Sequence, residues 1–341
     1  MPITFENFKP QGEHVSSLME QIRQDKLFHA ILITGDEGTG KKTLSDLIAR
    51  AVLCRSEESV RPCGRCKSCL MIDAKSHPDY ILIQKGVPLA PDIKKDRGTI
   101  PVEDIREMIR ITSSHSFEGG KRVVVVHDAD KMTPQAQNCL LKTLEDPPED
   151  TVFILNCKRA EQLLPTVVSR CRQFRLHNWS NEYIYTVLTR AGYNPDIASR
   201  ASIDSGGSVG IALKLAGDRE YWEKRKEITE TFLGIKQRSD ILRVSSVWKD
   251  RKDEADILFY IMESEFDRLL HFSCLRETDL SVSLPDDIPD SWKRFFEKAR
   301  ISDFCLLFDA ISAARKQVQS AVNFQSIIEQ FLFMMMEVKY K

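Results

Sequence analysis

The sequence carries almost no net charge and no long apolar run, and both absences narrow its class. Lys and Arg number 49 against 50 Asp and Glu, which leaves a formal net charge of −1. A chain without basic excess has no overall field that attracts DNA, so any nucleic-acid contact must be local or shared with partner chains. No apolar run approaches the roughly 18 residues of a membrane span, and the first residues lack a signal-peptide core. We therefore expect a cytoplasmic protein with no membrane contact.

The first half of the chain alternates between strand and helix patterns. Short apolar runs typical of buried strands are separated by stretches with helical spacing of apolar residues. Such alternation predicts an α/β domain with a mostly parallel sheet that helices cover on both faces. The expected strands are 31–34, 79–84, 123–127, 151–157 and 173–176.

The second half of the chain has helix patterns only. Ser180 suits the N-cap of a helix that Gly192 ends, and two further short helices lie on either side of Gly206 and Gly207. A longer helical block follows residue 217. Because 341 residues exceed one ordinary domain, we expect two or three domains, with the helical ones last.

A glycine-rich loop follows the first expected strand and opens a helix. Its letters, GDEGTGKKT at 35–43, match the first seven positions of the phosphate-loop pattern G-x-x-x-x-G-K-[ST]. Glycines let the backbone curl so that its N–H groups face phosphate oxygens, and the loop lysine adds a positive charge. The candidate nucleotide-binding residues are Gly35, Gly38, Thr39, Gly40, Lys41, Lys42 and Thr43.

The magnesium contacts of an active nucleotide hydrolase are missing from this loop and its partner strand. Lys42 stands where a Ser or Thr hydroxyl would bind Mg²⁺, and Thr43 comes one position late. After the strand at 123–126, His127 and Asp128 replace the acidic pair that holds Mg²⁺ and polarises water. The pattern predicts a phosphate-loop fold without magnesium chemistry. It leaves open whether ATP or ADP binds, and a bound nucleotide would be held without Mg²⁺.

Four cysteines lie close together in the sequence. Cys54, Cys63, Cys66 and Cys69 have the spacing C-x8-C-x2-C-x2-C, and four thiolates suffice for tetrahedral Zn²⁺. An iron–sulfur cluster is the alternative, because C-x2-C-x2-C also opens the bacterial ferredoxin pattern; that pattern continues with x3-C, where this chain has Asp73. Zinc is favoured, and with four protein ligands its role would be structural.

Taken together, these motifs resemble those of bacterial replicative clamp-loader subunits. The resemblance rests on the phosphate loop, the cysteine insert, "SHPDY" (76–80), "LLKTLEDPPEDTVFIL" (140–155) and "LLPTVVSRC" (163–171). It implies a RecA-like AAA+ domain with a parallel sheet at 1–177, with the zinc insert at 54–69. An all-α lid at 178–218 and an all-α collar domain at 219–341 would follow. The implied partners are the gamma/tau and delta subunits, the sliding clamp and, through the assembly, primed DNA.

Within that family the chain looks like a delta-prime-type subunit and not like the gamma/tau motor. The motor pattern has Thr after the loop lysine, Asp-Glu after the second strand and a lid arginine, where this chain has Lys42, His127-Asp128 and Gly210. The resemblance therefore implies a component of the DNA polymerase III holoenzyme that is not an active ATPase by itself. It also implies that Arg170, in "SRC", is an arginine finger acting in trans on a neighbouring subunit's ATP. The alternative is an active gamma/tau-type ATPase.

Overall fold

The computed structural model describes residues 4–56, 61–90, 98–117, 120–278, 288–320 and 322–340. The chain divides into two compact units, Met1–Ala216 and Gly217–Lys341. In the described residues, none of the helices has both the length and the apolar character needed to cross a membrane. The predicted order, an α/β part followed by helices alone, is confirmed.

The first unit is built on a five-stranded sheet in which every neighbouring pair of strands is parallel. The strand order is β2-β3-β4-β1-β5, so the first strand lies inside the sheet, between β4 and β5. The strands are β1 (Ala30–Thr34), β2 (Tyr80–Ile83), β3 (Arg122–Val126), β4 (Thr151–Cys157) and β5 (Arg172–Arg175). Strands β1, β3 and β4 are buried along their whole length, which explains their continuous apolar runs.

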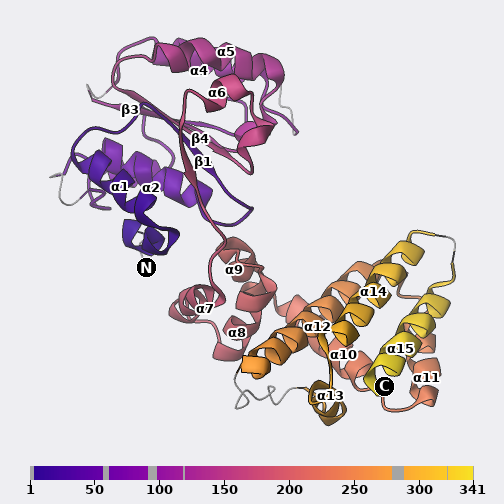
Figure 1. The fold of residues 1–341 in the computed structure, drawn as a ribbon. Coiled ribbons are helices and arrows are strands. Elements are labelled where there is room, and N and C mark those ends of the chain that lie inside the picture. Colours follow the sequence, from indigo (N-terminus) through magenta and orange to yellow (C-terminus); the bar gives the residue numbers. More distant parts are fainter. Residues whose placement is uncertain are drawn as a thin grey trace. The chain divides into compact units, whose positions relative to one another are not determined.

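Helices cover both faces of this sheet (Figure 1). On one face α4 (Val102–Thr112), α5 (Pro134–Glu145) and α6 (Pro165–Val168) enclose an apolar core that includes Leu32 and Leu140. The other face carries α1 (Glu13–Arg23) and α2 (Lys41–Leu53). The 3-10 helix η1 (Phe5–Gln11) precedes α1, and the short helix α3 (Lys67–Asp73) follows α2.

Three short helices complete the first unit, namely α7 (Asn181–Arg190), α8 (Pro195–Asp204) and α9 (Val209–Gly217). Helix α7 begins as its sequence predicts, because the Ser180 hydroxyl accepts a hydrogen bond from the Tyr183 N–H. We call α7, α8 and α9 the lid helices. The boundary between them and the sheet, expected at residue 177, stays a prediction.

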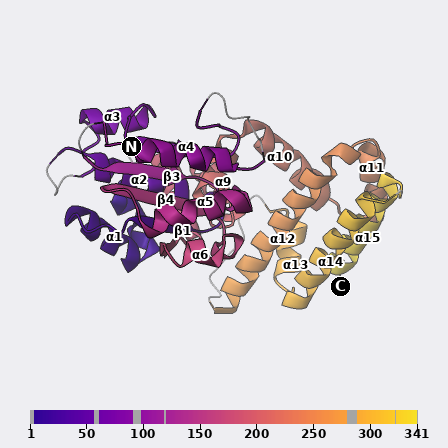
Figure 2. The ribbon, with the colours of Figure 1, turned by 90° about the horizontal axis from the view of Figure 1, so that it is seen from above.

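The second unit contains helices only. Its helices are α10 (Arg219–Leu233), α11 (Arg238–Trp248), α12 (Ala255–Thr278), α13 (Asp290–Phe296), α14 (Ile301–Val318) and α15 (Phe324–Tyr340). Helices α12, α14 and α15 run side by side, as Figure 2 shows. Their contacts bury large apolar side chains, among them Phe259, Phe304 and Phe331.

Candidate nucleotide site and cysteine cluster

The glycine loop connects the carboxyl end of β1 to the start of α2, where ligands of parallel sheets commonly bind. Gly38 and Gly40 have φ values of +73° and +98°, in the left-handed region that glycine adopts without steric cost. Gly40 is also the N-cap of α2, so the free N–H groups of that helix begin at the loop. The local backbone therefore keeps the form that an anion-binding loop needs.

A cavity of about 810 Å³ opens at this loop. It is lined by Gly38, Thr39, Gly40, Lys41, Lys42 and Thr43. Gly35, the remaining candidate, does not line it; a Cβ there would lie 2.7 Å from the Leu176 carbonyl oxygen. Lysines dominate the polar side of the cavity, which besides the loop carries Lys85, Lys131, Lys158 and Lys214.

The loop lysine is turned toward its own backbone. Lys41 Nζ donates hydrogen bonds to the carbonyl oxygens of Gly35, at 2.7 Å, and Asp36, at 2.6 Å. Partial burial lowers the pKa of Lys41, although nearby Asp128 and Asp36 oppose that shift. An entering phosphate would therefore compete with two carbonyl groups for this ammonium.

Lys42 and Asp128 form an ion pair across the mouth of the site. Their Nζ and Oδ2 atoms are 3.0 Å apart, and the Lys42 side chain remains about half exposed. The pair joins the position whose usual hydroxyl would bind magnesium, Lys42, to the second position of the acidic pair, Asp128. An ammonium thus already supplies Asp128 with a positive charge.

His127 is buried at the end of β3 and takes part in a polar network. Its Nδ1 lies 2.9 Å from the Asn156 side-chain nitrogen, and the Asn156 oxygen lies 2.8 Å from the Ser45 hydroxyl. Burial lowers the pKa of His127 to about 4, and the neighbouring Lys42 charge acts in the same direction. A neutral imidazole accepts the amide hydrogen bond, so at neutral pH this position offers neither a charge nor a carboxylate.

The lid helices contact the glycine loop directly, which the sequence analysis did not foresee. Gly210, where the motor pattern has arginine, donates its N–H to the Gly38 carbonyl at 3.0 Å. A Cβ on Gly38 would lie 2.0 Å from the Ser208 hydroxyl oxygen, so that, with its positive φ, this position favours glycine. The Trp179 indole N–H also donates to the Thr39 carbonyl, at 2.9 Å. Two loop carbonyls therefore accept hydrogen bonds, one from α9 and one from Trp179 just before α7.

Part of the cavity lining is apolar and aromatic. Trp179 stacks on Tyr183 with ring centroids 4.4 Å apart, and the Phe8 ring from η1 lies 5.8 Å from the same indole. Val187 and Leu213 also belong to this lining. It was not predicted, although Phe5 and Phe8, three positions apart, indicate a packed N-terminal turn.

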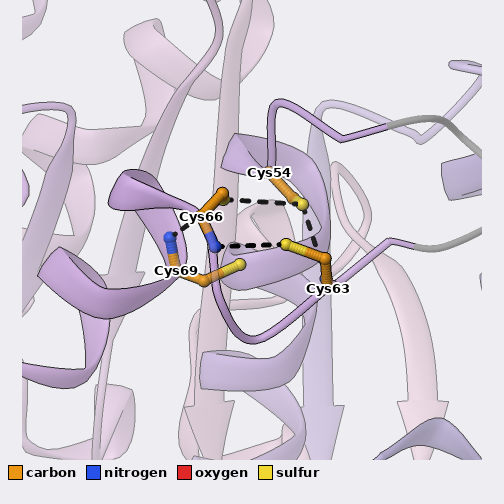
Figure 3. A group of neighbouring side chains, drawn as sticks. All are labelled: Cys54, Cys63, Cys66 and Cys69. Carbon is orange, nitrogen blue, oxygen red and sulfur yellow. Dashed lines mark hydrogen bonds between the residues drawn. The ribbon is translucent and has the colours of Figure 1, made fainter.

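The four cysteines come together at the junction of α2 and α3 (Figure 3). Cys54 ends α2, Cys66 is the N-cap of α3, and Cys69 lies inside α3. All four sulfur atoms lie within 4.8 Å of one another. Zn–S bonds of about 2.3 Å in a tetrahedron place sulfurs roughly 3.8 Å apart; Cys54 and Cys66 are 3.9 Å apart. The donor set therefore fits a structural zinc ion.

The hydrogen bonds within the cluster favour thiolates. The backbone N–H groups of Cys63, Cys66 and Cys69 each donate to the sulfur of another cysteine in the set, at 3.5, 3.3 and 3.5 Å. A hydrogen bond with Ser56 is the main cause that lowers the pKa of the Cys63 thiol to about 5, whereas burial raises that of Cys69. A bound cation would draw the remaining thiols into the thiolate form.

Arg170 lies apart from this chain's own cavity, on the segment between α6 and β5. Its NH1 group donates to the Thr166 carbonyl at 2.8 Å, and its NH2 group forms an ion pair with Glu145. About a third of the side chain is exposed. Arg170 does not line the cavity at the glycine loop, so it has no place in that site.

A glycine loop after an inner strand of this parallel sheet, with short lid helices on the loop, defines a phosphate-loop module of the AAA+ class. The family described as "DNA polymerase III, delta subunit" matches residues 10–180, half of the chain. The chain belongs to this family. The predicted resemblance is thereby confirmed at the level of the family.

Similar proteins include delta-prime and gamma/tau subunits of DNA polymerase III. The delta' subunit of Escherichia coli is 37% identical over 59% of this chain and 58% of its own length. The delta' subunit of Haemophilus influenzae is 34% identical over 60% of this chain and 59% of its own length. The chain thus spans about three fifths of these two relatives. The delta' subunit of Bacillus subtilis is 27% identical over 94% of both chains. The tau/gamma subunit of Haemophilus influenzae is 30% identical over 94% of this chain and 48% of its own.

Among solved structures, a gamma subunit-related protein from Thermotoga maritima matches with a TM-score of 0.42 and 18% identity, covering 94% of this chain and 99% of its own. RuvB from the same organism, a Holliday junction branch migration motor, has a TM-score of 0.42 and 15% identity. This match covers 73% of this chain and 72% of the RuvB chain. The fold class stated above rests on the sheet order and connections of this chain.

Proposed function

We propose that the chain is a delta-prime-type, non-motor subunit of a bacterial replicative clamp loader. The observation that carries the non-motor role is the Lys42–Asp128 ion pair, because an ammonium from the position that would bind magnesium engages the carboxylate at the position that would polarise water. Neutral, buried His127 supports the same conclusion from the neighbouring position. Without magnesium contacts the loop lacks the main means of stabilising charge in phosphoryl transfer.

The alternative, an active gamma/tau-type ATPase, has the overall similarity to tau/gamma subunits in its favour. The site residues argue against it. The lid arginine of the motor pattern is Gly210, and a Cβ at this position would already lie 3.0 Å from the Gly38 Cα atom. The purified chain should therefore turn over ATP no faster than a Lys41→Ala control, with or without primed DNA. Faster turnover that Lys41→Ala abolishes would establish the motor instead.

Nucleotide binding without Mg²⁺ is a separate proposal for the same cavity. The aromatic part of the lining suits a base, and the lysines of the lining suit phosphate oxygens. We expect ATP or ADP to bind with an affinity that the omission of Mg²⁺ does not reduce, since no magnesium contact is lost. Isothermal titration of the zinc-loaded protein with and without added MgCl₂ measures this.

Arg170 is proposed to act in trans, completing the ATP site of a neighbouring gamma/tau subunit. A guanidinium offers a permanent charge and a fixed fork of donors that matches phosphate oxygens. In a clamp loader reconstituted with gamma/tau and delta subunits, Arg170→Ala should lower turnover at that one site by roughly 10³-fold or more.

The matched control for this experiment is Arg172→Ala, which removes an exposed arginine two residues away on β5. It should leave ATP turnover unchanged in the presence of the sliding clamp and primed DNA. Equal rates for Arg170→Ala and the unmodified protein would remove the trans role.

Structural zinc is proposed for the four cysteines. Metal analysis of protein purified without added metal should give one zinc per chain and no iron. Cys66→Ser should lose that zinc, because one of four ligands and the N-cap of α3 change together. Cys274→Ser, at an exposed cysteine outside the cluster, should keep it.

A further inference from the structure

The Arg170 guanidinium makes two close contacts within its own chain and a third, longer one of 3.5 Å to the Ser169 hydroxyl. The Thr166 carbonyl accepts from NH1, and the Glu145 carboxylate pairs with NH2. Both partners come from helices on the same face of the sheet, since Glu145 is the last residue of α5 and Thr166 lies in α6. The guanidinium is thus oriented before any other chain arrives.

Glu145 stands where its own helix does not favour a carboxylate. The carboxyl end of a helix carries partial negative charge, which disfavours acidic side chains and favours basic ones. Arg170 supplies the missing positive charge at this end of α5. The position of Glu145 is therefore explained by its contact with Arg170 and not by the helix.

The contact leaves Arg170 with donors to spare. A guanidinium has five N–H donors, and the bonds to Thr166 and Glu145 engage only part of the fork. Within the described ranges, Arg170 Nε makes no hydrogen bond. The ion pair is also partly exposed, and such pairs are weak, so it does not lock the arginine away from an anion.

We infer that Glu145 is a positioning residue for Arg170. With the Thr166 carbonyl, it holds the guanidinium in one orientation and leaves the remaining donors for the phosphate of a neighbouring subunit's nucleotide. The inference rests on the proposed trans role of Arg170. Orientation in advance reduces the side-chain entropy that would otherwise be lost when the transition state forms.

The test uses the reconstituted clamp loader and separates kcat from KM for ATP. Glu145→Ala should lower kcat about 10-fold, within the roughly 10²-fold that misplacement of a group can cost, and leave KM unchanged. Glu145→Gln keeps an acceptor for the guanidinium and should recover most of that loss. Glu145→Lys should lower kcat further than Glu145→Ala, because it repels Arg170.

A double variant and a matched control complete the design. Glu145→Ala combined with Arg170→Ala should be no slower than Arg170→Ala alone. Glu107→Ala, which breaks a similar surface ion pair on α4, should leave kcat unchanged. Wild-type kcat for both Glu145→Ala and Glu145→Lys, or additive losses in the double variant, would overturn the inference.

The outcomes also distinguish this inference from the proposal beneath it. If Arg170→Ala slows ATP turnover and neither Glu145→Ala nor Glu145→Lys does, only the positioning role of Glu145 fails. If Arg170→Ala itself is without effect, the trans arginine fails and the role of Glu145 fails with it.

Discussion

At the scale of single residues, the charged side chains of the loop and of the end of β3 are engaged by partners within the chain. Lys41 binds the carbonyls of its own loop, and Lys42 binds Asp128. Because these contacts lie at or near the surface, each is individually weak, and a phosphate could replace them. Position 127 differs from these contacts. His127 is buried and offers no carboxylate, so a bound phosphate would not restore a magnesium ligand there.

His127 should make the stability of the first unit depend on pH. Its pKa is about 4 in the folded chain against an ordinary value of 6.5, so the unfolded chain takes up this proton first as the pH falls. The stabilisation is fully present above pH 6.5 and is lost as the pH falls toward 4. The loss amounts to about 3 kcal/mol at most, from a shift of roughly 2.5 units.

The measurement is urea unfolding of wild type and His127→Gln between pH 4 and pH 7. Glutamine keeps a hydrogen-bonding group near Asn156 but does not titrate. The free energies of unfolding of the two proteins should therefore converge or cross as the pH falls, with the wild type losing more. Parallel curves for the two proteins would show that His127 is not buried in neutral form.

Residue types could be predicted from the sequence, but their partners could not. Lys42, His127 and Gly210 depart from a known pattern, so the missing magnesium contacts were readable. The pairing of Lys42 with Asp128 joins residues 86 positions apart, and that of Arg170 with Glu145 joins residues 25 apart. Such pairs depend on where strands end in the sheet, which local spacing does not determine.

At the scale of elements, the contact between α9 and the glycine loop is made by two glycines. The Gly210 N–H binds the Gly38 carbonyl, and a Cβ on Gly38 would displace the Ser208 hydroxyl, which lies 2.0 Å from that position. This contact holds the start of α9 against the loop by backbone groups alone. A lid that carried an arginine here would instead have a side chain to place over the nucleotide.

Gly38→Ala should separate α9 from the loop. The added Cβ would lie 2.0 Å from the Ser208 oxygen, so this hydroxyl must give up its hydrogen bond from the Ile211 N–H at the start of α9, and amide hydrogen exchange should rise in α9 while the sheet stays protected. Gly206→Ala is the matched control, because Gly206 also has a positive φ (+57°) but no atom within 4 Å of its Cβ position. Equal exchange in α9 for both variants would contradict the collision.

Elements that are buried or well capped were predictable, and exposed or very short ones were not. Strand β4 matches the expected 151–157 because a central buried strand is a continuous apolar run. Strands β1, β3 and β5 each begin one residue earlier than expected, because the pairing of a strand's first residue depends on its neighbour in the sheet and not on its own apolar character. The four-residue helix α6 and the N-terminal η1 are too short for a helical period to appear in the sequence.

At the scale of the whole molecule, the chain contains two compact units, and each has a different cluster of polar side chains that bears on its stability. The first has the cysteine cluster, and the second has a buried ionic cluster in which Glu265 pairs with Arg225 at 2.6 Å and with Arg268 at 2.7 Å. Removing one member of a buried ionic group leaves uncompensated charge inside the protein. Each unit can therefore be perturbed separately.

Calorimetry should resolve two unfolding transitions that respond to different changes. Chelating the metal of the zinc-loaded protein should lower the midpoint temperature of only one transition, that of Met1–Ala216, because this unit holds all four ligands. Glu265→Ala should lower the free energy of unfolding of Gly217–Lys341 alone, by about 3–5 kcal/mol, because two buried guanidinium groups lose their counter-charge. Glu223→Ala, which breaks an exposed pair on α10, should move neither. If chelation and Glu265→Ala shift the same transition, the two units unfold as one cooperative body.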